Sequence, residues 1–300
     1  MKPKPKLKIA VIGCVEFSQH ALQTLIAESA CSVGLVITRA SSAMNSDFVD
    51  LSHVAQQHNI PFVHITGNDQ ATMEQALNQF QPDVIFCVGW SYLLKQTVLD
   101  IPKYGVVGYH PANIPENRGR HPLIWALVLG LKQTGSTFFL MDAGADTGKV
   151  LSQEPIPIAA TDYARDLYNS MLSVALQQIQ WLVNHWQYAY ANAKPQTNSG
   201  NAWRKRGKQD GKIDWRMSAD NIINLVRALS DPYPGAHFEY QGQDWIVWQA
   251  HKVEEDVPMN LEPGKLLAIT ATSITVKCGD KAVCATKLSS MPELAVGDYL

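Results

Sequence analysis

The residues best suited to chemistry lie together in residues 108–122, directly after an apolar run that predicts a core strand. This stretch holds two histidines, two asparagines, two arginines and three prolines. A histidine can move a proton near neutral pH, and an amide or guanidinium can hydrogen-bond a developing negative charge. Because prolines restrict the backbone, such a loop at the end of a strand is typical of a preorganised site. A polar surface loop is the alternative interpretation.

A second polar stretch, residues 142–148, follows the next predicted strand. It contains Asp146, and a carboxylate at this place can hold a histidine of the neighbouring loop in one tautomer. We therefore predict that Asp146 orients His110. By itself, Asp146-Thr147-Gly148 is also an ordinary turn signal.

The first half of the chain supplies a scaffold for these loops. Apolar runs alternate there with helical periodicities, which predicts βαβ units and a Rossmann-like, doubly wound, mostly parallel sheet. Ligands bind such sheets beyond the carboxyl ends of the strands. The predicted strands are 9–12, 33–37, 61–64, 83–88, 105–109 and 136–141, and the predicted helices are 17–27, 52–58, 71–79, 123–131 and 163–188.

A polar, turn-rich stretch from Ala193 to Asn201 is the best linker in the chain. It predicts a catalytic domain over residues 1–192, a linker over 193–204 and a second domain over 205–300. Short apolar runs without intervening helices predict that the second domain is a small, OB-like β-barrel. We interpret this barrel as a structural or dimerisation element, which leaves a homodimer open.

The composition excludes several classes of protein. The formal net charge of −2 and the pI of about 6.5 argue against a generic nucleic-acid binder. No run of about 18 apolar residues predicts a membrane span, and the short run Leu7–Val15 is interpreted as a strand rather than a signal peptide. The five cysteines form no Cys-x-x-Cys pair and predict reduced core thiols of a cytoplasmic protein. The remaining histidines have no metal-ligand spacing, so we expect no metal site.

Together, the two polar stretches resemble the formyltransferase family, which includes the methionyl-tRNA, phosphoribosylglycinamide and sugar N-formyltransferases. The family's signature reads Asn-x-His-x-x-x-x-Pro-x-x-Arg-Gly-x-x-Pro, followed downstream by Asp-x-Gly. The resemblance covers essentially the whole chain. The matching positions in this sequence are His110, Pro115, Arg118, Gly119, Pro122, Asp146 and Gly148.

The resemblance implies a formyl transfer from N10-formyltetrahydrofolate, with His110 and Asp146 as catalytic residues. Trp90 is equally consistent with ordinary core packing, and Asn68-Asp69 with the N-cap of a helix. The implied cofactor-binding residues are Phe86, Val88, Gly89, Trp90, Asp142 and Asp146. The implied substrate-binding residues are Asn68, Tyr109, Arg118, Gly119 and Arg120.

The chain departs from the family pattern at Gly108, where the family has an asparagine. In the family that amide stabilises the oxyanion formed at the formyl carbon, and losing such a donor costs about 10²–10³ in rate. The nearest replacements are the amides of Asn113 and Asn117, which we add to the catalytic candidates; a backbone N–H or a water is another. If none serves, the chain is a non-catalytic folate or nucleotide-sugar binding protein.

Two features indicate the acceptor. Methionyl-tRNA enzymes that resemble this chain carry a basic insertion where residues 38–50 have one arginine and two aspartates, Asp47 and Asp50. Residues 203–215 and 227–236 are similar to the sugar formyltransferases. We therefore expect a nucleotide-linked amino sugar, a 4-amino-4,6-dideoxyhexose, used in lipopolysaccharide or O-antigen biosynthesis, and no nucleic acid or membrane partner.

The alternative acceptor is methionyl-tRNA. The basic run over residues 204–208 could contact a diphosphate or RNA, and its other interpretation is a solvated linker edge.

Overall fold

The computed structural model describes residues 6–42, 47–197, 199–290 and 293–300, which form two compact units. The first unit comprises residues 1–119, 134–156 and 170–202, and the second comprises 120–133, 157–169 and 203–300. The units interleave along the sequence, because residues 120–133 and 157–169 belong to the same unit as the C-terminal part.

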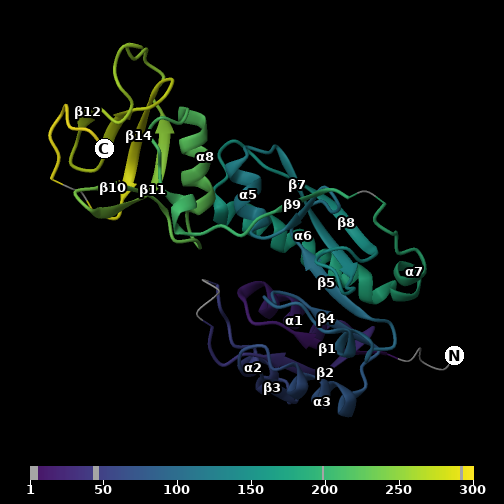
Figure 1. Ribbon diagram of the computed structural model, residues 1–300. Helices are drawn as coiled ribbons and strands as arrows, with labels where there is room; N and C mark the ends of the chain where they lie inside the picture. Colours follow the sequence, from purple (N-terminus) through teal and green to yellow (C-terminus); the bar gives the residue numbers. More distant parts are fainter. Residues whose placement is uncertain (1–5, 43–46, 198, 291–292) are drawn as a thin grey trace. The chain divides into compact units, whose positions relative to one another are not determined.

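In the described residues of the first unit, seven strands form one sheet in the order β3-β2-β1-β4-β5-β7-β8 (Figure 1). The pairs from β3 to β5 are all parallel, and β5 pairs with β7 in antiparallel register. This confirms the predicted mostly parallel sheet. The strands are β1 (Leu7–Ile12), β2 (Cys31–Thr38), β3 (Phe62–His64), β4 (Val84–Cys87), β5 (Val106–His110), β7 (Gln133–Leu140) and β8 (Val150–Pro157).

Helices connect the parallel strands, as the alternation predicts. The side chain of Asp69 accepts a hydrogen bond from the Thr72 N–H at 3.2 Å, so the helix-cap interpretation of Asn68-Asp69 is confirmed. The expected helix over 163–188 is divided at His185. The helices are α1 (Glu16–Ala27), α2 (Ser52–Gln57), α3 (Gln70–Phe80), α4 (Gln96–Leu99), α6 (Ala164–Asn184) and α7 (Trp186–Ala191).

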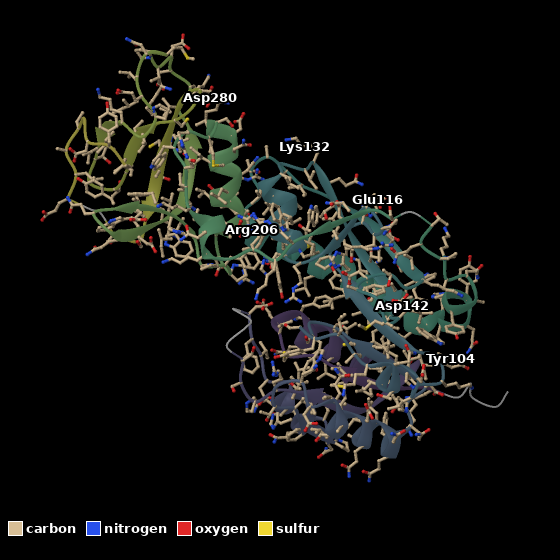
Figure 2. All side chains as sticks on the ribbon, viewed as in Figure 1. Tyr104, Glu116, Lys132, Asp142, Arg206 and Asp280 are labelled. Carbon is tan, nitrogen blue, oxygen red and sulfur yellow. The ribbon has the colours of Figure 1, made fainter. Side chains whose placement is uncertain are left out.

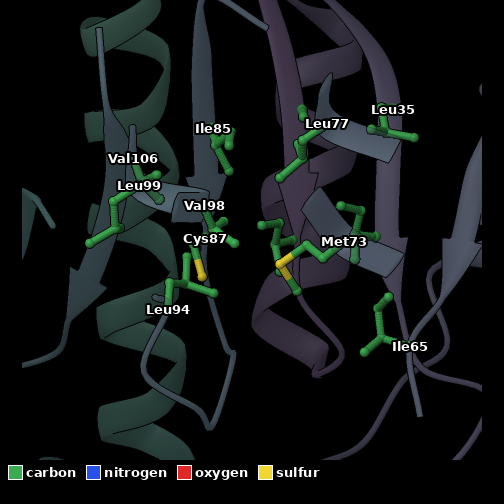
Figure 3. Packing of buried hydrophobic residues seen from close by; sticks show 13 residues of the cluster. Leu35, Ile65, Met73, Leu77, Ile85, Cys87, Leu94, Val98, Leu99 and Val106 are labelled. Carbon is green, nitrogen blue, oxygen red and sulfur yellow. The ribbon is translucent and has the colours of Figure 1, made fainter. Parts of the chain in front are cut away.

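The core of this sheet lies around β4, which is buried along its whole length. Met73 and Leu77 of α3 belong to the same buried cluster as Ile85 and Cys87 of β4 (Figure 3). Burial raises the pKa of the Cys87 thiol to about 12, since a thiolate is poorly solvated there. All five cysteines are free and four are buried, which confirms core thiols.

The second unit contains an antiparallel sheet of five strands in its described residues, ordered β10-β11-β14-β13-β12. Helix α8 (Ala219–Leu229) packs on β11, and α5 (Pro122–Val128) packs on α8. The structure thus places an antiparallel, half-barrel sheet where a barrel was predicted. The strands are β10 (Ala236–Tyr240), β11 (Gln243–Lys252), β12 (Leu266–Ile269), β13 (Ile274–Lys277) and β14 (Ala282–Leu288).

Two very short strands, β6 (Asn117–Gly119) and β9 (Asn201–Trp203), pair with each other as a separate sheet. Through this pairing, the end of the expected linker contacts the loop that follows β5. The first unit extends to residue 202.

Within the described ranges, no helix is long and apolar enough to cross a membrane. Over the same ranges, no group of three or more His, Cys, Asp or Glu side chains gathers as metal ligands.

Candidate functional site

His110 is the last residue of β5 and lies at the carboxyl end of the strand, the edge at which such sheets bind ligands. It is only 4% exposed. Its Nε2 lies 2.7 Å from the backbone carbonyl oxygen of Asn117. Because a carbonyl can only accept, Nε2 donates this hydrogen bond and carries a proton. The nitrogen left for chemistry is therefore Nδ1.

Asp146 lies beside that nitrogen, with its Oδ2 3.5 Å from His110 Nδ1. The same oxygen accepts a hydrogen bond from the Gly119 N–H at 3.2 Å. A carboxylate in this place can accept a hydrogen bond from a proton on Nδ1. The His110–Asp146 pair can therefore accept a proton from a bound substrate. Its two members come from different elements: His110 ends β5, and Asp146 lies on the loop after β7.

The loop between His110 and Asn117 is held by side chains of the neighbouring strands, the buried Thr137 and the exposed Gln153. Thr137 of β7 donates from Oγ1 to the Ala112 carbonyl at 2.7 Å. Gln153 of β8 donates from Nε2 to the Ile114 carbonyl at 2.9 Å. These bonds make the loop a rigid extension of the sheet, which keeps the Asn117 carbonyl in place against His110.

The two candidate amides, Asn113 and Asn117, lie on this loop and are half-buried. The oxygen of the Asn113 amide lies against Gly135 of β7, only 2.0 Å from where a Cβ atom at Gly135 would stand. Asn117 is the first residue of β6. Its contact with His110 is made by the backbone carbonyl and not by the side-chain amide.

Gly108, the departure from the family pattern, pairs across strands with Phe139 of β7. A Cβ atom at Gly108 would lie 2.8 Å from Cζ of Phe139 and 2.9 Å from Cγ of Met141. Real Cβ atoms do not approach other atoms so closely. The aromatic ring of Phe139 and the Met141 side chain therefore fill the space that a side chain at residue 108 needs.

Arg118, an expected substrate contact, is held by a segment that the sequence marked only as a linker. Its Nε and Nη2 donate to Oε1 of Gln196 at 3.1 and 2.6 Å. Its Nη1 donates to the Ser199 carbonyl at 2.9 Å. Gln196 was missed by sequence reasoning, since a lone glutamine in a polar stretch gives no local signal. Arg120 belongs to the second unit and is exposed.

The residues expected to hold a flat ring lie at the end of β4. Phe86 and Val88 are fully buried. Gly89 and Trp90, which follow the strand, are half-buried. Among the described residues, the buried indole N–H of Trp90 has no hydrogen-bond partner, which leaves one donor for a ligand. The guanidinium of Arg39 lies 5.6 Å from the Trp90 ring centroid.

Three other expected contacts have partners elsewhere. Asp142, labelled in Figure 2, is exposed and closes its own turn by accepting from the Gly144 N–H at 3.0 Å. Asn68 accepts from Gln70 in the turn before α3. The ring of Tyr109 stacks on Phe17 at 4.4 Å, and burial raises the pKa of its hydroxyl. Tyr109 points to the opposite face of the sheet from His110, since side chains alternate along a strand.

The basic run over residues 204–208 lies in the second unit, where acidic side chains compensate it. Arg204 donates from Nη1 to Asp210 Oδ2 at 2.9 Å, and this bond holds the pKa of Asp210 well below its usual range. Lys208 pairs with Asp244. Arg206 (Figure 2) places its guanidinium 4.6 Å from the ring centroid of Trp125.

Comparison with family models gives two matches that together span most of the chain. Residues 7–183 match the formyl transferase model, and residues 205–294 match the model of the formyl transferase C-terminal domain.

Curated relatives and solved structures extend this result. The methionyl-tRNA formyltransferase of Clostridium perfringens is 31% identical over 294 residues, covering 94% of this chain and 92% of the relative. That of Alkaliphilus oremlandii is 29% identical, covering 98% and 96%.

Among solved structures, an N-formyltransferase from Helicobacter canadensis, in complex with folinic acid and dTDP-3-aminofucose, is 18% identical and has a TM-score of 0.72, covering 94% of this chain and 99% of that one. A sugar 3N-formyl transferase, solved in the presence of dTDP and 5-N-formyl-THF, is 19% identical with a TM-score of 0.69, covering 96% and 100%. At this level of identity the likeness is one of fold.

Proposed function

Because the chain belongs to the formyltransferase family, and is therefore a formyl-group transferase, we propose that it transfers a formyl group from N10-formyltetrahydrofolate to the amine of a nucleotide-linked amino sugar. The acceptor is a 4-amino-4,6-dideoxyhexose of bacterial surface polysaccharide biosynthesis. The observation that carries the proposed chemistry is the His110–Asp146 pair at the carboxyl end of the sheet.

The residues at the end of β4 suit a folate donor. A pterin ring needs an apolar slot with a few hydrogen-bonding groups. Trp90 offers a buried N–H without a partner among the described residues, and Gly89 beside it has a φ of +68° and packs against Val15 and Ser18. Phe86 and Val88 would support this slot from behind. When bound, the donor supplies an electrophilic formyl carbon, and the two sugar enzymes with similar folds were solved with formylated folates.

The chain's own residues then manage the proton. As the amine of the acceptor forms its bond to the formyl carbon, it loses a proton, which Nδ1 of His110 accepts beside the Asp146 carboxylate. His110 would then return this proton to N10 of the folate as the bond between N10 and the formyl carbon breaks, so that tetrahydrofolate leaves as a neutral amine. Positioned acid–base groups of this kind contribute about 10²–10⁴ in rate. The amides of Asn113 and Asn117 are the proposed donors to the oxyanion, in place of the side chain that Gly108 lacks.

The acceptor is inferred from charge. The cations Arg204 and Lys208 are already paired with Asp210 and Asp244, so they are poor contacts for an RNA backbone. Asp47 and Asp50 keep the loop after β2 acidic, although residues 43–46 of that loop lie outside the described residues. Methionyl-tRNA is the second candidate, favoured by the names of the relatives near 30% identity.

One experiment separates the acceptors. The protein is incubated with formyltetrahydrofolate and a panel of dTDP-, UDP- and GDP-linked amino sugars, and in parallel with charged initiator tRNA. We expect formylation of a sugar amine and none of the tRNA. Formylation of the tRNA alone, with KM rising steeply with salt, would replace the sugar proposal with the RNA one. Tight binding of the folate without any product would support a non-catalytic binding protein.

The division of labour along the chain is part of this proposal. Residues 1–192 bind donor and acceptor, residues 193–204 connect the domains, and residues 205–300 form the second domain, which we propose as a structural or dimerisation element. The proposed setting is the cytoplasm, without a membrane or nucleic-acid partner and without a metal.

A further inference from the structure

The side chain of Gln196 uses all of its hydrogen-bonding capacity on the two loops of the site. Its Oε1 accepts twice from Arg118, at 2.6 and 3.1 Å. Its Nε2 donates to the carbonyl of Asp146 at 2.9 Å and to that of Gly148 at 2.7 Å. An amide has two acceptor positions and two donor hydrogens, so the side chain is saturated.

The segment that carries Gln196, described over residues 194–197 and 199–201, is bonded near both of its ends to other parts of the first unit. Lys194 exchanges backbone hydrogen bonds with Val150 at 2.8 and 2.9 Å. Asn201 donates from its N–H to the Glu116 carbonyl at 2.8 Å. Gly200 has a φ of +58° and lies so close to the Pro115 carbonyl that a Cβ atom would stand 1.5 Å from its oxygen. We call residues 194–197 and 199–201 the clasp.

The clasp joins the loop after β5, whose Asn117 carbonyl binds His110, to the loop after β7, which carries Asp146. Asp146 has a φ of +58°, an uncommon conformation for a residue with a side chain. Two contacts hold it there: the Gln196 amide at its carbonyl and the Gly119 N–H at its carboxylate. Its carboxylate lies 3.5 Å from Nδ1 of His110, so a small shift of the loop changes the pairing.

We propose that Gln196 is a positioning residue, which sets Asp146 opposite His110 by tying the Asp146 backbone to Arg118. The clasp is then part of the formyl-transfer site as well as the connection to the second unit. The inference deepens the proposed function and rests on it for the reaction, whereas the geometry of His110 can be tested without any substrate.

The test uses two substitutions that divide the role of the amide. Gln196→Met keeps the length of the side chain and removes both the acceptor oxygen and the donor nitrogen of the amide. Gln196→Glu keeps the acceptor for Arg118 but loses both donor hydrogens to the carbonyls of Asp146 and Gly148. We expect either change to lower kcat about 10- to 100-fold with little change in KM, the size expected for a misplacement near 1 Å. Gln187→Met, on the exposed face of α7, is the matched control and should leave kcat unchanged.

A double-substitution cycle shows whether Gln196 acts through Asp146. In an Asp146→Asn background, Gln196→Met should lower kcat less than about threefold further, since coupled residues are not additive. A full additional loss would overturn the proposal. Thermal unfolding of each variant is measured beside kcat. If Gln196→Met fails to fold, Gln196→Glu alone decides the result, because it keeps the bonds to Arg118.

A second measurement does not depend on the acceptor. The ¹⁵N chemical shifts of the two His110 ring nitrogens are recorded for the full chain without substrate. They should change in Gln196→Met and Gln196→Glu but not in Gln187→Met. Unchanged shifts together with wild-type kcat would overturn the inference. Changed shifts in a protein that formylates no acceptor would keep the positioning role and refute the proposed function.

Discussion

Two regions of the molecule are equally rich in polar residues, yet they use them in opposite ways. Around His110, backbone carbonyls and N–H groups hold the functional side chains by one end and leave the other end usable: Nε2 is bound to Asn117, whereas Nδ1 faces Asp146. In the second unit, the first and last cations of the basic run are bound by aspartates outside the run, Arg204 by Asp210 and Lys208 by Asp244.

The difference teaches that density of charge does not identify a site. What distinguishes the first region is Nδ1 of His110, which is held in place by the bond at Nε2 but is not itself bonded to a backbone group of the described residues. The two regions also differ in the sequence distance between the paired residues. Asp210 lies only six residues from Arg204, so this pair forms locally. Asp146 lies far along the chain from His110, and only the fold brings the two together.

The largest effect is expected from substitutions in the His110–Asp146 pair. His110→Ala and Asp146→Asn are each expected to lower kcat by about 10²–10⁴, because the proton of the attacking amine then has no positioned acceptor. Steady-state formylation kinetics measure this, with circular dichroism to verify folding. Arg204→Gln in the compensated run is the control and should change kcat less than about threefold. Near-normal turnover in either site variant would remove the distinction between the two regions.

A smaller effect is expected at Gly108, where the side chains of Phe139 and Met141 fill the space that an asparagine side chain would need. Gly108→Asn should lower the free energy of unfolding by about 1–3 kcal/mol, because the new Cβ atom overlaps Phe139 and Met141. Kinetic assays of the same variant should show no gain in kcat. Ser32→Asn, at an exposed position of β2, is the matched control for urea unfolding. A rise in kcat at unchanged stability would mean that the missing amide fits after all.

The smallest effect concerns His121, which lies among the cations of the second unit. Burial, with Arg120, Lys205 and Arg206 nearby, lowers the pKa of His121 below its ordinary value of 6.5. As the pH falls through 6.5, the unfolded chain therefore binds a proton that the folded chain refuses, and stability decreases until the folded pKa is reached.

His121→Asn should flatten this slope, since asparagine tolerates the left-handed φ of +54° and does not titrate. The midpoint of thermal unfolding is compared between pH 7 and 5. The exposed His58→Asn variant is the control and should keep the wild-type slope. An unchanged slope in His121→Asn would show that the basic run does not perturb its histidine.

Much of the fold follows from local pattern. The strand–helix alternation of the first half, the fully buried β4 and the cap at Asp69 all depend on residues adjacent in sequence. β8 was missed because its polar residues and two prolines hide an edge strand. The pairing of β6 with β9 was missed for a different reason: these short polar strands are stable only because each meets the other.

By itself the sequence determined the chemistry available: a histidine after a core strand, an aspartate after the next, and the amides and arginines between them. The tertiary structure decided which of these groups meet. It placed Nδ1 of His110 toward Asp146, filled the position beside Gly108 with Phe139, and brought Gln196 back onto both loops. The reason is physical. Residue type fixes what a group can donate or accept, but distance and burial, which decide its use, depend on segments far apart in the chain.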